Sequence, residues 1–159
     1  MEIRDAVPDD AAAACQVLRR SIAELCTADH RNDPALVAGW LSNKTVENVG
    51  AWIAQPGSSL LVAVEDGAIL AVGSVTDAGH ITLNYVSPDA RFRGVTRAML
   101  QALESRAIER GNTQCTLSST ETGRRLYLTA GYIEQGPPDG KFGLQSGYPM
   151  SKQLPPRNP

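Results

Sequence analysis

The sequence predicts one α/β or α+β domain, in which helices flank a central mixed, mostly antiparallel sheet. Two observations predict this class. Apolar residues recur at helical spacing in two long stretches, 7–26 and 94–110. Short β-prone runs, separated by turn residues, stand between and after these stretches. The length of 159 residues suits one domain, so we expect residues 1–154 to form it and the proline-rich residues 155–159 to be a flexible tail.

The first third of the chain is predicted to contain one short strand and three helices. The strand covers residues 2–6, and a helix with an acidic first turn follows and runs to about residue 26. Residues 29–34 form a polar break. Within it, Asp33 before Pro34 is typical of an N-cap followed by proline at the first helical position. Two short helices are then expected, at 35–41 and 46–54.

A block of strands occupies the middle of the chain. The runs at 59–65 and 68–76 are apolar and β-prone, and Asp66-Gly67 between them is a strong hairpin signal. A third strand is expected at 80–86. Simple alternation along it predicts one face with Ile81, Leu83 and Tyr85 and another with His80, Thr82 and Asn84.

The last third alternates helices and strands. The long helix at 94–110 ends at Gly111, which is typical of a helix C-terminus. A short helix is expected at 121–130, and residues 137–147 form a loop rich in glycine and proline. The remaining strands are expected at 114–118, 132–135 and 148–154.

Composition and charge exclude several classes of protein. With 42% hydrophobic and 20% charged residues, the chain can bury a core, and its net charge of -2 argues against nucleic acid as the main partner. The chain shows no secretory signal, and its apolar runs are too short to cross a bilayer, so we expect a cytoplasmic protein without a membrane partner. The three cysteines, Cys15, Cys26 and Cys115, show no metal-ligand pattern, so no metal is expected.

The turn before the second long helix predicts an anion-binding site. A helix N-terminus offers unpaired N–H groups and roughly half an elementary positive charge, which suit a phosphate group. Gly94 lets backbone come close to phosphate oxygens, and Thr96 adds a hydroxyl. Arg91, Arg93 and Arg97 add positive charge to a slightly acidic chain. Taken alone, this pattern is more typical of an ordinary strand–loop–helix junction with solvated arginines.

The wider sequence resembles the GNAT family of N-acetyltransferases. Residues 86–96 are similar to the family signature V-x-P-x-x-Q/R-x-x-G-x-G/A, and residues 126–132 to its L-Y-x-x-x-G-F/Y element. The two elements stand in the family's order, with one predicted strand between them, and the resemblance extends over the whole chain. Three positions depart from it: Thr96 replaces a small residue, Thr120 an asparagine that reaches pantetheine, and Gly123 an alanine.

The resemblance implies acetyl-CoA (coenzyme A) as cosubstrate. In the family's fold, the strand before the turn splays from its neighbour and pairs with the pantetheine. This places the backbone of Tyr85 and Val86 along the pantetheine, and an N–H group of one of them on the oxyanion of the reaction. The residues expected to bind the cofactor are Tyr85, Val86, Arg91, Phe92, Arg93, Gly94, Val95, Thr96, Arg97 and Thr120.

Tyr127 is the candidate acid for the departing thiolate. The resemblance implies that its hydroxyl lies near the cofactor sulfur, and a phenol with a reference pKa of about 10 can give a proton to a nascent thiolate. Without the resemblance, Tyr127 is an amphipathic core residue of the helix at 121–130.

The acceptor end of the site is less defined by the sequence. His80 is the candidate base, because its reference pKa suits proton transfer through water; the alternative is a partly solvated turn histidine. His30 and Asn84 are candidate substrate-binding residues. His30 forms a polar cluster with Asp29 and Asp33, and its alternative is a solvated loop with an N-cap. The glycine-rich stretch 140–148 is expected to fold over the acceptor.

The resemblance therefore implies an N-acetyltransferase that transfers an acetyl group to a primary amine by direct attack in a ternary complex. The acceptor is expected to be a small molecule or peptide, and the resemblance favours a homodimer. The alternative is a sensor module that binds acyl-CoA without useful transferase activity. Both readings use the turn at 91–96, but only the enzyme requires Tyr127.

Overall fold

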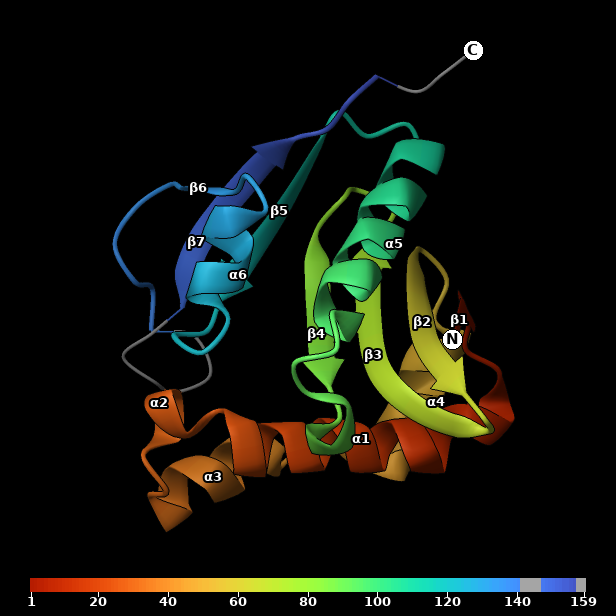
Figure 1. Cartoon of the computed structure of the whole chain (residues 1–159), viewed down its shortest axis with the longest axis vertical. Helices are drawn as coiled ribbons and strands as arrows, with labels where there is room; N and C mark the ends of the chain where they lie inside the picture. The colour runs from red at the N-terminus through yellow and green to blue at the C-terminus, as the bar shows by residue number, and fades with distance from the viewer. Residues whose placement is uncertain (141–146, 157–159) are drawn as a thin grey trace.

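Two antiparallel sheets lie side by side in the computed structural model, which describes residues 1–140 and 147–156 (Figure 1). The larger sheet has the strand order β1-β2-β3-β4 and consists of β1 (Glu2–Asp5), β2 (Ser58–Glu65), β3 (Ala68–Thr76) and β4 (Ile81–Val86). The smaller sheet has the order β5-β7-β6 and consists of β5 (Gln114–Ser119), β6 (Ile133–Glu134) and β7 (Tyr148–Gln153). The predicted class of helices around mostly antiparallel strands is confirmed.

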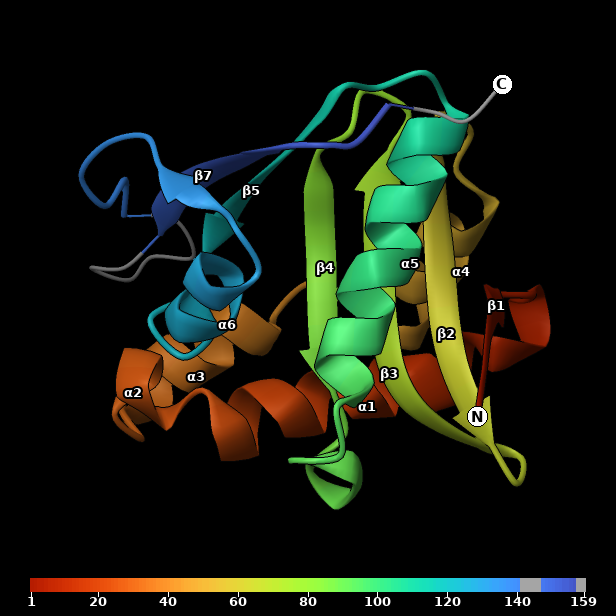
Figure 2. The same ribbon diagram turned by 45° about the horizontal axis from the view of Figure 1, so that its top comes forward.

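Helices cover both faces of the larger sheet (Figure 2). The helix α5 (Val95–Glu109) lies on one face and packs Met99 and Leu103 against Leu61 and Val75. On the opposite face lie α1 (Ala11–Leu25), which follows the 3-10 turn η1 (Pro8–Asp10), and α4 (Val46–Ala54). The remaining helical segments are α2 (Thr27–His30), α3 (Pro34–Leu41), η2 (Pro88–Ala90) and α6 (Arg124–Thr129).

Most predicted elements are confirmed within a few residues. Asp33 caps α3, because its Oδ1 accepts hydrogen bonds from the N–H groups of Ala35 at 2.9 Å and Leu36 at 3.3 Å. The predicted polar break at 29–34 is partly wrong, since its first residues belong to the four-residue α2. The predicted helix at 121–130 begins later, at Arg124. Segments this short contain too few turns for apolar spacing to reveal them.

A bulge in β4 overturns the predicted faces of that strand. The pairing with β3 joins Ser74 to Leu83 and Val75 to Ile81, so β4 carries one extra residue. Because side chains alternate along a strand, one extra residue exchanges the faces beyond it. Ile81 therefore packs on the α5 side, whereas Leu83 and Tyr85 pack on the α1 side.

The two sheets meet where β4 and β5 begin and then part. A parallel bridge joins His80 to Thr116, and the N–H of Thr116 donates to the Gly79 carbonyl at 3.0 Å. Beyond this point, β4 and β5 belong to separate sheets in the described part of the chain. The splay that the resemblance implied is thus present (Figure 1).

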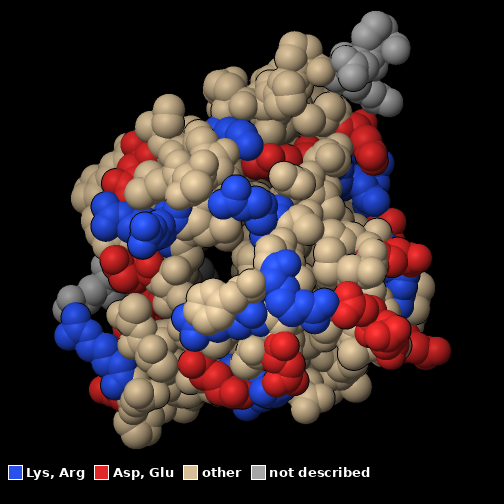
Figure 3. Space-filling model, viewed as in Figure 1, with Lys and Arg blue, Asp and Glu red and all other residues tan. Residues whose placement is uncertain are grey.

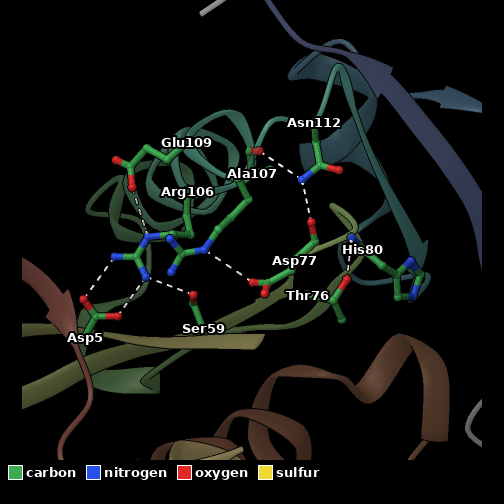
Figure 4. A network of polar contacts seen from close by, with 10 residues as sticks. Asp5, Ser59, Thr76, Asp77, His80, Arg106, Ala107, Glu109 and Asn112 are labelled. Carbon is green, nitrogen blue, oxygen red and sulfur yellow. Dashed lines mark hydrogen bonds and ion pairs between the residues drawn. The ribbon is translucent and has the colours of Figure 1, made fainter. Parts of the chain in front are cut away.

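Polar side chains fix the turn at this closed end of the splay (Figure 4). Asn112 Nδ2 donates to the Asp77 carbonyl at 2.9 Å and to the Ala107 carbonyl at 3.0 Å, which ties the turn to the end of α5. The N–H of His80 donates to Thr76 Oγ1 at 3.1 Å. These contacts fix the start of β4, the point from which β4 and β5 part.

Gly79 is expected to be required at this turn. Its φ is +85°, and a Cβ would lie 2.6 Å from the Gln114 carbonyl oxygen. The exchange of Gly79 for alanine should therefore lower the free energy of unfolding by about 2 kcal/mol or more, measured by urea denaturation. Gly67 is the matched control, since its φ is +78° and a Cβ there meets no heavy atom within 4 Å. Equal losses in the two alanine variants would contradict the collision with Gln114.

The described helices include none with the length and apolar character that spanning a bilayer requires. Residues 141–146 of the loop expected over the acceptor, and residues 157–159 of the expected tail, lie outside the described part.

Candidate functional site

A cavity of about 560 Å³ opens where β4 and β5 part. Its walls come from β4, from the turn before α5 and the start of that helix, from β5 and α6, and from the end of α1. Figure 3 shows a hollow in this face of the molecule, with Lys and Arg side chains at its rim. The volume lies within the usual range for sites that bind small molecules and cofactors.

The turn before α5 presents unpaired N–H groups to this cavity. The first hydrogen bond of the helix runs from the N–H of Ala98 to the Gly94 carbonyl at 3.1 Å. The N–H groups of Val95, Thr96 and Arg97 therefore have no partner within the helix, and all three residues line the cavity. Gly94 precedes them with φ +76°, in the left-handed region, and a Cβ there would meet no heavy atom within 4 Å. The arrangement suits a phosphate group.

The arginines of the turn divide between two tasks. Arg91 and Arg97 line the cavity, and the guanidinium of Arg91 lies 4.5 Å from the ring centre of Phe92, which is 89% exposed. Arg93 instead pairs with the Glu65 carboxylate, with Nη2 2.8 Å from Oε1, and does not line the cavity. This ion pair holds the pKa of Glu65 below its usual value. The structure therefore does not bring Arg93 to the predicted cofactor site.

Tyr127 reaches the cavity from α6. Its side chain is 8% exposed, and its Oη accepts a hydrogen bond from Asn84 Nδ2 at 3.2 Å. Burial raises the pKa of Tyr127 to about 12, and the hydrogen bond from Asn84 opposes the rise. The hydroxyl is therefore protonated at neutral pH, as an acid must be.

The residues before α6 pack closely beneath Tyr127. Thr120 lines the cavity, and its Oγ1 accepts a hydrogen bond from the N–H of Gly123 at 3.0 Å. A Cβ at Gly123 would lie 3.2 Å from Tyr127 Cε2, so a larger residue would push against this ring. Two of the three departures from the family pattern, Thr120 and Gly123, thus belong to one packed turn.

The outer edge of β4 supplies further backbone groups. The N–H of Ser87 donates to the Leu70 carbonyl at 2.7 Å, toward β3. Because alternate residues of an antiparallel strand face the partner, Tyr85 also faces β3, whereas Asn84 and Val86 direct their N–H and carbonyl groups to the cavity. Of the two predicted backbone contacts, Val86 therefore has the suitable direction. The Tyr85 side chain packs against the cluster of Ile22, Cys26 and Trp40.

The end of α1 forms the far wall of the cavity. Ser21, Leu25 and Cys26 line it, and burial is the main reason that the pKa of Cys26 is raised to about 12. Asp29 ties this wall to the turn before α6, because its carboxylate accepts from the N–H of Glu121 at 2.7 Å and from Thr122 Oγ1 at 2.5 Å. The sequence contained no local signal for this contact between residues far apart in the chain.

His30 does not line the cavity. Its ring is fully buried, Nδ1 accepts from the N–H of Asn32 at 3.0 Å, and Nε2 lies 2.8 Å from the Ile22 carbonyl oxygen. Because the N–H of Asn32 can only donate, Nε2 carries the proton and donates to Ile22. The predicted polar cluster is therefore divided: His30 belongs to the interior, Asp33 caps α3 and Asp29 binds the turn before α6.

His80 lies at the closed end of the splay and lines a smaller hollow of about 320 Å³ with Thr116 and Asp139. Its Nδ1 is 2.8 Å from Thr116 Oγ1. The smaller hollow and the main cavity share Leu117 and Ser118 as lining residues. The structure thus places His80 near the cavity but does not bring it to Tyr127.

Two buried polar atoms at the cavity have no hydrogen-bond partner among the described residues, Asn84 Oδ1 and Ser118 Oγ. Asn84 was predicted as a site residue and Ser118 was not. Such atoms are typical of a site that a ligand or water completes. The described residues contain no group of three or more His, Cys, Asp or Glu side chains arranged to hold a metal ion.

The sequence and the fold were compared with those of known proteins. The model of the acetyltransferase (GNAT) domain matches residues 28–154, and no curated protein matches. A GCN5-related N-acetyltransferase structure from Rhodopseudomonas palustris has a TM-score of 0.85 and 23% identity, over 96% of this chain and 95% of its own. The PaiA N-acetyltransferase of Thermoplasma acidophilum, in complex with coenzyme A, has a TM-score of 0.81 and 17% identity, over 96% and 98%. The structure of YncA from Salmonella typhimurium with its cofactor acetyl-CoA has a TM-score of 0.73 and 23% identity, over 100% of this chain and 96% of its own.

Proposed function

The chain belongs to the acetyltransferase (GNAT) family, and on that premise we propose that it transfers the acetyl group of acetyl-CoA to a primary amine of a small molecule or peptide. One observation carries the proposal. A single cavity brings together the unpaired N–H groups at the start of α5 and the protonated hydroxyl of Tyr127. The first suits a phosphate-bearing cofactor and the second suits the leaving thiolate.

The cofactor end of the cavity uses the start of α5. The N–H groups of Val95, Thr96 and Arg97 bind the pyrophosphate, with Arg91 adding positive charge from the cavity wall. The pantetheine follows the outer edge of β4 toward Tyr127, where Val86 offers N–H and carbonyl groups. Two structural relatives were solved with coenzyme A or acetyl-CoA, which supports this ligand.

The reaction needs positioned groups more than a protein nucleophile. The acetyl thioester supplies the electrophilic carbon; the amine nitrogen bonds to it and the carbon–sulfur bond breaks. An outward N–H of β4, from Val86, donates to the carbonyl oxygen as it gains negative charge. Tyr127 Oη gives its proton to the departing sulfur, and the amine loses a proton to water. His80 lines the neighbouring hollow, so a base there would act through water.

The acceptor end favours an amine without further positive charges. Among the described residues that line the cavity, no Asp or Glu offers a carboxylate to a second ammonium group, and both charged side chains, Arg91 and Arg97, lie at the cofactor end. The segments 141–146 and 157–159 contain no Asp or Glu in their sequence. Ser21, Leu25 and Cys26 give the far wall a neutral, partly apolar surface, and the unpartnered Asn84 Oδ1 is the acceptor that we propose for a substrate N–H.

An acceptor panel tests the function and this preference together. With acetyl-CoA, amines with a neutral or anionic body, such as amino-acid amides and peptide N-termini, are expected to exceed spermidine and aminoglycosides in kcat/KM by about 10-fold, because no carboxylate of the described lining would pair with the additional ammonium groups. Free thiol release is the measurement. Polycationic amines as the best acceptors would overturn the preference. Tight coenzyme A binding without thiol release from any amine would instead favour the sensor function.

A further inference from the structure

One hydrogen bond crosses the cavity beside the proposed reaction centre. It runs from Asn84 Nδ2 on β4 to Tyr127 Oη on α6, over 3.2 Å. Alternation along β4 places Asn84 on the face opposite Leu83 and Tyr85, and because of the bulge this is the face of Ile81, toward α5 and Tyr127. The amide is partly buried, and its Oδ1 has no partner among the described residues.

The direction of this hydrogen bond matters for proton transfer. A phenol oxygen that accepts a hydrogen bond keeps its own O–H proton free to point elsewhere. In the described part of the chain, the Tyr127 hydroxyl makes no hydrogen bond other than the one that it accepts from Asn84. The accepted hydrogen bond therefore fixes the direction of the O–H group, and no described residue holds its proton. A donated N–H also favours the phenolate over the phenol, which makes the hydroxyl a better acid.

We propose that Asn84 is a positioning residue: its amide N–H holds the oxygen of Tyr127 so that the hydroxyl proton points at the departing sulfur. The proposal rests on the proposed acetyltransfer. In the step, Tyr127 Oη passes its proton to the sulfur as the carbon–sulfur bond breaks. The phenolate that results is held by the N–H of Asn84 and regains a proton from water, which carries the proton lost by the amine. Protons and electrons therefore balance without a further reactant.

The ionisable groups around Tyr127 keep their charge over the pH range in which the role of Asn84 can be tested. The Tyr132 ring packs edge-on with its centre 5.6 Å from the Tyr127 ring centre, and Tyr85 lines the same cavity. Burial raises the pKa of Tyr132 and of Tyr85 above their ordinary values. The pKa of Cys26 is raised to about 12. None of these three groups changes its charge between about pH 5 and pH 9, and His80 and the substrate are the same in variant and wild type, so a titration that appears only in the ratio of their rates belongs to the introduced group.

A double-mutant cycle tests the proposal. Asn84→Ala is expected to lower kcat about 10- to 100-fold, because it removes a hydrogen bond to a charge-developing oxygen, while the Kd of coenzyme A changes less than about twofold. In the Tyr127→Phe background, which has no hydroxyl to position, the same exchange should lower kcat by a factor that is about fivefold or more smaller, because only the proposed contact of Asn84 Oδ1 with the substrate is then lost. An equal loss in both backgrounds would overturn the role of Asn84 and leave the acetyltransfer intact. A wild-type kcat in Tyr127→Phe would overturn the acid itself.

The variant Asn84→Asp adds a readout that a purely structural role would not move. An ionised aspartate only accepts, so it would accept a hydrogen bond from the Tyr127 O–H and turn that proton away from sulfur, whereas a protonated aspartate can donate as asparagine does. The ratio of its kcat to that of the wild type should therefore rise about 10-fold as the pH falls from 8 to 5, and the ratio for Asn84→Ala should stay constant. A constant ratio for Asn84→Asp would contradict the proposal. Because aspartate has the shape of asparagine, this test holds even if Asn84→Ala fails to fold.

Discussion

Replacement of Tyr127 by phenylalanine is expected to lower kcat about 100-fold or more, with an unchanged Kd for coenzyme A. The exchange removes one oxygen and keeps the ring that packs edge-on against Tyr132. Without the hydroxyl, the sulfur must leave as an unprotonated thiolate or take its proton from water. The proposed coenzyme A site uses instead the start of α5, which lines another part of the cavity. Steady-state thiol release and calorimetric titration measure the two effects separately.

Tyr132→Phe is the matched control. Tyr132 lies beside Tyr127, but its hydroxyl donates to Glu104 Oε2 at 2.7 Å and it does not line the cavity. Loss of this hydroxyl should lower the free energy of unfolding by about 1 kcal/mol and leave kcat near the wild-type value. If Tyr127→Phe kept the wild-type kcat, the sulfur would depart without help from this residue, and water would be the proton source.

Local sequence signals predicted the elements whose determinants lie within a few residues of one another. Asp66-Gly67 gives two consecutive positive φ angles, +52° and +78°, and the hairpin of β2 and β3 follows from them. The cap at Asp33 and the helix α4 likewise depend on residues that are close together in the sequence. The bulge in β4 was not predictable, because it depends on how β4 pairs with β3, and no residue within β4 marks it.

The same distinction holds within the site. The turn proposed to bind the anion is one continuous stretch of chain, so its glycine and its helix start were visible in the sequence. The contacts of the other predicted site residues depend on tertiary structure. Arg93 pairs with Glu65, which lies far away in the sequence, and His30 bonds to the carbonyl of Ile22 in the interior. A charged or polar side chain shows what it is able to bind, whereas tertiary packing decides which of several partners it meets.

Replacement of Gly94 by aspartate is expected to abolish most of the affinity for coenzyme A. A Cβ at this position meets no heavy atom within 4 Å, so the new side chain disturbs no neighbour. Its charge would stand beside the N–H groups of Val95 and Thr96, where the proposed pyrophosphate binds. Repulsion between like charges at a separation of about 4–5 Å and an effective dielectric constant of about 20 amounts to roughly 3–4 kcal/mol. A rise in Kd of about 100-fold or more is therefore expected.

Gly94→Asn separates this charge from the backbone requirement. Asparagine has the size of aspartate and, like it, tolerates the left-handed conformation that φ +76° demands. It should therefore raise the Kd of coenzyme A only about 10-fold or less, and the difference between the two variants should shrink at high salt, where charges are screened. The Kd values of both variants come from calorimetric titration with coenzyme A. Pantetheine, which lacks the pyrophosphate, should bind the two variants equally. Equal affinities of both variants for coenzyme A itself would mean that the pyrophosphate lies elsewhere, and the start of α5 would then lose its place in the proposed site.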